Sequence, residues 1–313
     1  MIGTALEPLR LAPNPIHRFY RGGEAIARFR GDAPGLSGSE PLSHEGGHAP
    51  EDWVGSTTPA FGEEPLGLSL LPDGTLLRDA VAAEPEAFLG PEHVARYGAD
   101  TMLLVKLLDA GERLPVHYHP DDEFAQRHGF AHGKTEAWLM VEARAGASIW
   151  LGFRDDFDRE MLRERLDDPS LLAMLNERPV AEGDLIFVPA GVPHALGDGI
   201  LMVELQQPSD LSVLLEWSAF GLHGDLDLDR ELEALDTTAF SDRPWTDEFF
   251  RVERHGAGSL DPGFSILVVL EGRGRVGGLG VKRGDTVLLP HGAGAVALEG
   301  DLEAIRCRPP GAA

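Results

Sequence analysis

Two short stretches decide the fold: GERLPVHYH at residues 111–119 and GDLIFVPAGVPH at residues 183–194. In the first, one residue separates His117 from His119, so in a strand both side chains point to the same face. In the second, a Gly-Asp turn leads into an apolar strand that ends at Pro-Ala-Gly, and His194 follows. Three neutral imidazoles placed in this way can converge on one cation. The spacing therefore predicts a metal site.

The composition limits the classes of protein to consider. The chain has 313 residues, enough for one large or two modest domains. Its net charge of −25 argues against a nucleic acid or an anionic membrane as partner. The single cysteine, Cys307, excludes an internal disulfide. No signal peptide and no membrane-length apolar run is found, so we expect a soluble, cytoplasmic protein.

Short apolar runs between frequent glycines and prolines indicate many strands rather than a helical bundle. We expect strands at 101–110, 184–190, 200–207 and 212–217, and a hairpin over 136–153 turned by Ala145-Gly146. Helical spacing predicts one helix over 84–98 and two over 155–177, broken at Asp167-Asp168-Pro169. A charged helical piece is expected at 227–236, and a long loop at 30–52.

The last part of the chain repeats an earlier pattern. KRGDTVLLPHGAGAV at 282–296 echoes AEGDLIFVPAGVPHAL at 181–196, which suggests an internal duplication. The second copy lacks the histidine pairs, so we expect it to be metal-free. We therefore predict a metal-binding domain at 1–240, with an N-terminal elaboration and a helical insert at about 155–178. A smaller β domain is expected at 241–313.

The two histidine stretches together resemble the two halves of the cupin signature, in the correct order and at the correct spacing. This resemblance implies a mainly β fold with two double-stranded β-helix (cupin) barrels in tandem and a small helical insertion. A fourth ligand is still needed, and Glu123 and Glu136 are the candidates. We favour Glu136, because a ligand at the start of a strand has a rigid mount.

A narrower resemblance is to the type I phosphomannose isomerases, also called mannose-6-phosphate isomerases. It rests on LLVKLLDAGERLPVHYHPDDEFAQ, GKTEAW, GDLIFVPAGVPHAL, VELQQPSD and EDWVGS. The resemblance implies Zn2+ bound by His117, His119, Glu136 and His194. The family usually has glutamine at the first of these positions. His117 makes the site richer in nitrogen, so iron, manganese or nickel is also compatible with it.

The same resemblance implies the activity. It would be a metal-dependent aldose–ketose isomerase, acting on mannose 6-phosphate and fructose 6-phosphate or a related sugar through a cis-enediol. Lys134 and Glu204 are candidates for proton transfer, and Lys106, Lys134 and Trp53 for contacts with the substrate. The expected partner is a small sugar or sugar phosphate, bound by a monomer or homodimer.

Two departures from the family pattern bear on the substrate. Pro115 stands where the family has a serine, and no arginine follows Ser209-Asp210, where the family has one. Either another arginine substitutes or the substrate carries no phosphate. Two other classes of protein stay open at this point: a non-catalytic carbohydrate-binding or sensor cupin, and an iron cupin oxygenase.

Overall fold

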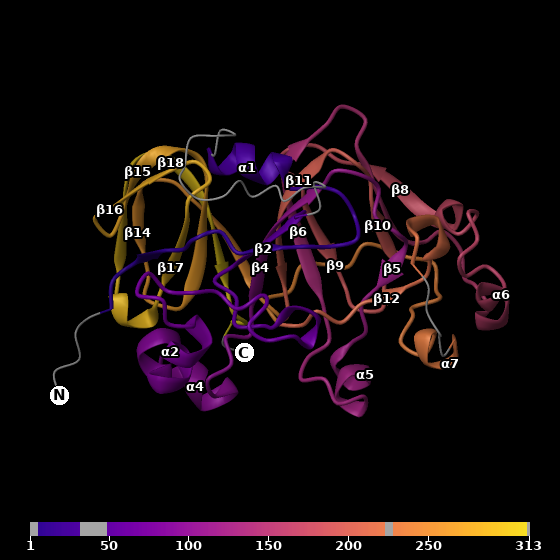
Figure 1. The fold of residues 1–313 in the computed structure, drawn as a ribbon, viewed down its shortest axis with the longest axis horizontal. Helices are drawn as coiled ribbons and strands as arrows, with labels where there is room; N and C mark the ends of the chain where they lie inside the picture. Colours follow the sequence, from indigo (N-terminus) through magenta and orange to yellow (C-terminus); the bar gives the residue numbers. More distant parts are fainter. Residues whose placement is uncertain (1–5, 32–48, 223–227, 312–313) are drawn as a thin grey trace.

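The computed structural model describes residues 6–31, 49–222 and 228–311, in which three antiparallel sheets dominate (Figure 1). The C-terminal sheet lies on the left of this view, and the two sheets that carry the histidine stretches lie to its right. This mainly β architecture confirms the fold class predicted from the sequence.

A six-stranded sheet forms the middle layer. Its strands are, in spatial order, β2 (Pro15–Ile16), β3 (Glu51–Val54), β4 (Leu104–Ala110), β11 (Ile200–Gln206), β6 (Glu136–Ala143) and β9 (Leu185–Val188). Every residue of β4 and β11 is buried, so the sheet is covered on both faces. Burial on both faces explains why these two strands read as mostly apolar runs rather than as alternating patterns.

A five-stranded sheet packs against one face of the middle layer. Its strands are, in spatial order, β12 (Val213–Leu214), β5 (His117–Tyr118), β10 (His194–Leu196), β7 (Ser148–Phe153) and β8 (Leu175–Pro179). A hydrophobic cluster between the two sheets joins Leu108 and Met202 of the middle layer to Leu151 and Leu196 of the second sheet. The two sheets thus enclose the first barrel.

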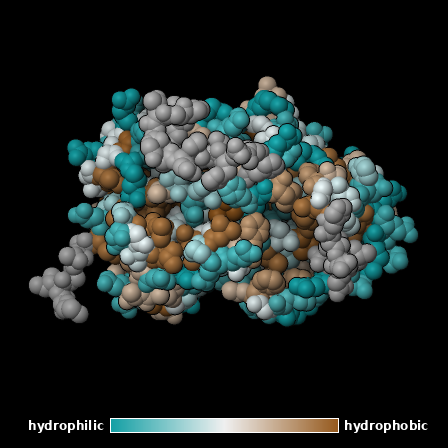
Figure 2. Space-filling model, viewed as in Figure 1, coloured by the Kyte–Doolittle hydropathy of each residue, from teal (hydrophilic) through white to brown (hydrophobic). Residues whose placement is uncertain are grey.

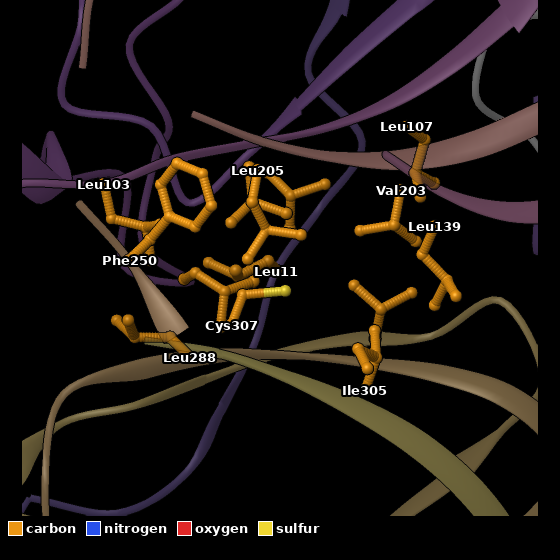
Figure 3. Packing of buried hydrophobic residues seen from close by; sticks show 14 of the residues in the cluster. Leu11, Leu103, Leu107, Leu139, Val203, Leu205, Phe250, Leu288, Ile305 and Cys307 are labelled. Carbon is orange, nitrogen blue, oxygen red and sulfur yellow. The ribbon is translucent and has the colours of Figure 1, made fainter. Parts of the chain in front are cut away.

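The C-terminal sheet covers the other face of the middle layer. Its central path is β1 (Leu9–Arg10), β17 (Thr286–Leu289), β15 (Ser265–Val276), β18 (Val296–Arg308) and β13 (Arg251–His255), with β14 (Gly258–Leu260) beside β18 and β16 (Leu279–Lys282) beside β15. Figure 3 shows the shared core, in which Leu107, Leu139 and Val203 meet Ile305 and Cys307. β1 comes from the N-terminal segment, and the division into domains at residue 240 stays a prediction.

Short helices complete the fold. The α-helices are α1 (Glu24–Arg30), α2 (Leu77–Ala83), α3 (Pro85–Leu89), α4 (Pro91–Tyr97), α5 (Asp122–Arg127), α6 (Arg159–Arg163) and α7 (Leu228–Glu231). The 3-10 helices are η1 (Ala60–Gly62), η2 (Leu172–Met174), η3 (Ser218–Phe220) and η4 (His291–Ala293). On the face shown in Figure 2, hydrophilic residues occupy most of the outer edge. Within the described residues, no helix combines the length and apolar character needed to cross a bilayer.

The prediction of one helix over 84–98 was wrong. Gly90 separates α3 from α4 with a φ of 91°, a conformation that favours glycine. A Cβ at this position would also lie 2.7 Å from Nδ1 of His291. Pro91 then starts α4, where the missing N–H of a proline costs nothing.

The predicted hairpin over 136–153 was also wrong. β6 pairs with β11 and β9, whereas β7 pairs with β10 and β8, so the turn between them carries the chain from one sheet to the other. In place of the two helices predicted over 155–177, the structure has α6 and η2, and β8 begins within this span at Leu175. Of the helical piece predicted at 227–236, α7 covers four residues. Most of the loop predicted at 30–52 lies outside the described residues.

Candidate active site

Strand register brings the two histidine stretches together. In the pairing of β5 with β10, His194 lies opposite His117, and their ring centroids are 4.2 Å apart. His119 follows β5, with its ring centroid 5.1 Å from that of His117 and 5.0 Å from that of His194. One ring nitrogen from each of the three histidines lies within 4.8 Å of the other two. The structure therefore brings these three predicted ligands to one place.

Backbone carbonyls orient all three imidazoles. Nδ1 of His117 lies 2.8 Å from the carbonyl oxygen of Pro115. Nδ1 of His119 lies 2.9 Å from the carbonyl oxygen of Leu211. Nδ1 of His194 lies 2.9 Å from that of Val192. A carbonyl oxygen can only accept, so each Nδ1 carries the proton and each Nε2 keeps its lone pair. Burial lowers the pKa of each imidazole to about 3. All three are therefore neutral, the form in which histidine binds a metal.

Glu136 lies beside the histidines. Its Oε1 is 3.1 Å from Nε2 of His119, and its Oε2 is 3.9 Å from Nε2 of His194. The indole N–H of Trp138 donates to Oε2 at 3.1 Å. Burial tends to raise the pKa of Glu136, but the positive charge of Lys134 outweighs it and holds the pKa well below its usual range. Glu123 is exposed on α5.

The donor set fits a divalent metal. Nε2 of His194 is buried without a hydrogen-bond partner, as expected for a nitrogen that awaits another ligand. Three imidazole nitrogens and one carboxylate form a combination that holds zinc and other transition metals in proteins. Nζ of Lys134 lies 2.5 Å from Oε1 of Glu136 and 3.0 Å from Nε2 of His119, so these atoms already attract a cation.

Glu204 and Lys106 extend the charged network along the middle sheet. The two residues are register partners in β11 and β4, and Nζ of Lys106 lies 3.3 Å from Oε1 of Glu204. Nζ of Lys134 is 3.8 Å from the same oxygen. Burial, followed by the charge of Glu136, raises the pKa of Glu204 to about 7 against the opposing effect of the lysines. Glu204 therefore lies between both lysines and next to the candidate ligands.

A cavity of about 300 Å³ lies beside the histidines and the charged network. Among the predicted residues, those that line it are His117, His119, Lys106, Lys134, Glu136 and Glu204. Trp53 is fully buried and stands behind this wall, where its indole N–H donates to Oε2 of Glu51 at 2.7 Å. Nζ of Lys106 lies 5.1 Å from the centroid of the Trp53 ring. The geometry gives Trp53 a supporting position rather than a place on the cavity surface.

The cavity also contains residues that sequence reasoning missed. Arg18 lies after β2, and its guanidinium contacts Glu51 at 2.8 Å and Asp210 at 2.7 Å. The hydroxyl of Tyr20 donates to Oε1 of Glu51 at 2.5 Å. Glu51 belongs to the EDWVGS stretch, so the family-like motif did point to this wall, although to the tryptophan rather than to the glutamate. Arg18 has no local sequence signal.

The facing antiparallel sheets and the cluster of three histidines and a glutamate define a cupin barrel with a candidate metal centre. No protein-family model matches the chain. Mannose-6-phosphate isomerase ManA of Bacillus subtilis is 33% identical over 234 residues, which cover 65% of this chain and 73% of that protein. The chain belongs to the mannose-6-phosphate isomerase family.

Other comparisons agree with this family. Mannose-6-phosphate isomerase of Streptococcus mutans is 29% identical over 280 residues, covering 79% of this chain and 86% of that protein. The crystal structure of the mannose 6-phosphate isomerase from Bacillus subtilis superposes with a TM-score of 0.78 over 97% of this chain and 100% of that one, at 24% identity. A mannose 6-phosphate isomerase structure bound with zinc and yttrium has a TM-score of 0.75 at 15% identity, with the same coverage. The two structures show the fold.

Proposed function

We propose that this protein is a metal-dependent aldose–ketose isomerase that interconverts mannose 6-phosphate and fructose 6-phosphate, or a related sugar pair. The observation that carries the proposal is the place of Glu204: a buried carboxylate in the same cavity as the histidine cluster, within 4 Å of two ammonium groups. A metal-dependent aldose–ketose isomerase uses a cation that polarises the carbonyl and a group that transfers a proton between two neighbouring carbons. This cavity offers both.

The proposed ligands are Nε2 of His117, His119 and His194 and the carboxylate of Glu136. When bound, a divalent cation would polarise the substrate carbonyl and stabilise the negative charge of an enediolate as a Lewis acid. Zinc is the proposed metal, since a related isomerase structure is described as bound with zinc. Glutamine at the first position is replaced here by His117, which keeps a ligating atom and makes the donor set richer in nitrogen.

Glu204 is the proposed proton carrier. Its carboxylate would take the proton from C2 of the open-chain aldose and return it to C1 of the cis-enediol, while the hydroxyl proton of O2 passes to O1, which yields the ketose. Lys134 would donate a hydrogen bond to a substrate oxygen, because its ammonium group lines the cavity beside Glu136. Lys106 holds Glu204 from the other side and fixes the direction of the carboxylate. These roles need no group beyond those that line the cavity.

The test is an isomerase assay on zinc-loaded and chelator-treated protein, with NMR detection of the products. The substrates are mannose, glucose and fructose and their 6-phosphates, each in air and without oxygen. We expect one aldose–ketose pair to equilibrate only with metal, independently of oxygen, and not with His194→Ala. Oxygen consumption would favour the oxygenase alternative. Absence of turnover despite stoichiometric metal would favour the binding-protein alternative.

A further inference from the structure

A second cavity, of about 480 Å³, lies between α4 and the C-terminal sheet. Figure 1 shows α4 below that sheet. The cavity shares no lining residue with the one beside the histidines, so the proposed isomerase reaction uses none of its side chains. Its volume falls within the range of about 300–1,000 Å³ that is typical of ligand pockets. The cavity is therefore large enough for a small molecule of its own.

Three arginines line this cavity, although the chain as a whole is strongly acidic. Arg96 comes from α4, Arg251 begins β13 and Arg308 ends β18. Arg251 and Arg308 are register partners on neighbouring strands, and like charges in this position are unfavourable unless something compensates them. Among the described residues of the lining, Glu92 is the only acidic one, and it is exposed. The wall of the cavity therefore has an excess of positive charge.

Two of these arginines have no ion pair. Nη1 of Arg96 donates to the carbonyl oxygen of Gly311 at 3.4 Å, and Nε of Arg251 donates to that of Pro309 at 3.1 Å. Within the part of the chain that the structure describes, no carboxylate pairs with either guanidinium. Burial and the charge of Arg308 lower the pKa of Arg251, and the more distant carboxylates offset this only in part. Both side chains thus lack a counter-charge in direct contact.

The neighbouring carboxylates already have partners. Nη1 of Arg308 lies 3.1 Å from Oε1 of Glu253, and its Nη2 lies 3.1 Å from Oδ2 of Asp261. The same two carboxylates also pair with Arg306, which lies outside the cavity lining. Two acidic groups therefore contact two guanidinium groups, and neither contacts Arg251. An anion in the cavity would supply the charge that is missing there.

Arg308 gives the second, independent observation. Its side chain is only 9% exposed, and its Nε is buried without a hydrogen-bond partner among the described residues. Such a donor costs free energy unless a ligand or a water supplies an acceptor. Gly263, which also lines the cavity, makes room for this guanidinium, because a Cβ there would lie 2.7 Å from Nη2 of Arg308. The arginine is thus fixed in place and still lacks one acceptor.

The rest of the lining indicates what an anion there would carry. A guanidinium binds phosphate oxygens with two parallel hydrogen bonds, so three of them suit a phosphate group. The imidazole of His291 adds another polar group to the wall. The remaining side chains are mostly apolar and include Leu89, Pro91, Pro262, Phe264, Pro309 and Pro310. A ligand with a phosphate at one end and an organic body at the other matches both parts.

We propose that the cavity between α4 and the C-terminal sheet binds a small organic phosphate monoester, with its phosphate group held by Arg96, Arg251 and Arg308. A phosphate monoester carries nearly two negative charges at neutral pH, which match the two arginines that lack an ion pair. Nε of Arg308 gains an acceptor, and the organic body packs against the prolines. This site goes beyond the proposed isomerase function and does not depend on it.

The test is calorimetric titration of the zinc-loaded full chain with phenyl phosphate, inorganic phosphate and phenol. We expect one equivalent of phenyl phosphate to bind in a way that Arg251→Gln and Arg96→Gln each weaken by at least about tenfold, since each removes a hydrogen bond between charged groups. Inorganic phosphate lacks the apolar body and should bind at least about tenfold more weakly than phenyl phosphate. Phenol lacks the anion and should show no binding that these variants change.

The chain offers a matched control on the same strand. Arg254 lies three residues after Arg251 in β13, pairs with Glu303 at 2.8 Å and is absent from the cavity lining. Arg254→Gln removes the same charge from the protein, so it should leave the affinity for phenyl phosphate unchanged. The comparison separates a contact in the cavity from a general effect of net charge.

Each outcome decides. No binding of phenyl phosphate, or equal affinity in Arg251→Gln, Arg96→Gln and Arg254→Gln, overturns the site. Equal affinity for inorganic phosphate and phenyl phosphate overturns the role of the organic body, and equal affinity for phenol overturns that of the phosphate. If Arg251→Gln does not fold, Arg96→Gln decides, because the side chain of Arg96 is exposed on α4. Loss of isomerase turnover on removal of zinc, or its absence throughout, leaves this proposal standing.

Discussion

His117 and His194 face each other as register partners on neighbouring antiparallel strands, with ring centroids 4.2 Å apart. A slip of one residue in this register would turn one of the two side chains to the opposite face of the sheet. The barrel walls therefore determine the position of the proposed ligands, and the backbone carbonyls behind the rings fix their tautomers.

The choice between two glutamates as fourth ligand can be tested directly. Glu136→Ala removes the carboxylate beside His119 and His194, so zinc affinity should fall by at least about tenfold, because the site loses a donor from its coordination shell. Glu123→Ala, on the exposed side of α5, should bind zinc as the unchanged protein does. Competition with a chromophoric chelator measures both. Equal affinity of the two variants would refute the assignment of Glu136.

Replacement of Glu204 should separate catalysis from metal binding. Glu204→Gln keeps the shape of the side chain but cannot carry the proton, so we expect kcat to fall by about 10²–10⁴. Bound zinc should stay stoichiometric. Glu142→Gln, on the same sheet but paired with Arg283 outside the cavity, is the control and should keep full activity. A kcat of Glu204→Gln within twofold of the control would assign proton transfer to another residue.

Lys106 should matter for stability as much as for activity. Its side chain is 3% exposed and compensates Glu51 and Glu204. Lys106→Met leaves both carboxylates without this partner, and we expect the free energy of unfolding to fall by about 3 kcal/mol. Arg254→Met breaks the exposed pair with Glu303 and should cost less than about 1 kcal/mol. Urea unfolding of the two variants compares these losses, and similar values would show that the network around Lys106 is not stabilising.

A pair outside the metal centre predicts a pH-dependent stability. Nε2 of His132 lies 2.7 Å from Oδ2 of Asp100. The hydrogen bond to Asp100 raises the pKa of His132. Burial tends to raise the pKa of Asp100, but the hydrogen bond from His132 lowers it overall. The contribution of His132 to folding stability is therefore full below about pH 6.5, and it is lost as the pH rises through the raised pKa of His132. That of Asp100 is present above about pH 4 and is lost as the pH falls through its lowered pKa.

His132→Gln tests this pH dependence. The pair is partly exposed, so we expect a loss of at most about 1 kcal/mol at pH 6 and a smaller loss at pH 9. Urea unfolding of the variant and the unchanged protein at both pH values gives the two differences. A loss that is larger at pH 9 than at pH 6 would contradict the predicted sign.

The sequence predicted the candidate ligands because their information is local. A spacing of two residues in a strand puts the side chains of His117 and His119 on the same face. A Gly-Asp turn followed by a strand brings His194 to the same end of the barrel. The hairpin prediction failed for a related reason. Local patterns identify β6 and β7 as strands, but they do not say that consecutive strands belong to different sheets. That choice is made by the pairing of β6 with β11, which lies far along the chain.

The residues that sequence reasoning missed depend on contacts between distant segments. Arg18 and Asp210 are separated by 192 positions, and nothing in the irregular N-terminal segment marks this arginine. The absence of an arginine after Asp210 was visible in the sequence, whereas the guanidinium that Asp210 binds was not. Trp53 was singled out in the EDWVGS stretch, yet Glu51 of the same stretch is the residue that reaches the cavity.

The measurement that tests the central claim most directly is isomerisation by the zinc-loaded protein in D2O, followed by NMR. The substrates are mannose and mannose 6-phosphate. If Glu204 carries the proton between C2 and C1, part of the ketose should contain deuterium at C1, and product and label should both be lost in Glu204→Gln. Ketose formed by Glu204→Gln at the rate of the unchanged protein, with or without deuterium at C1, would contradict the account.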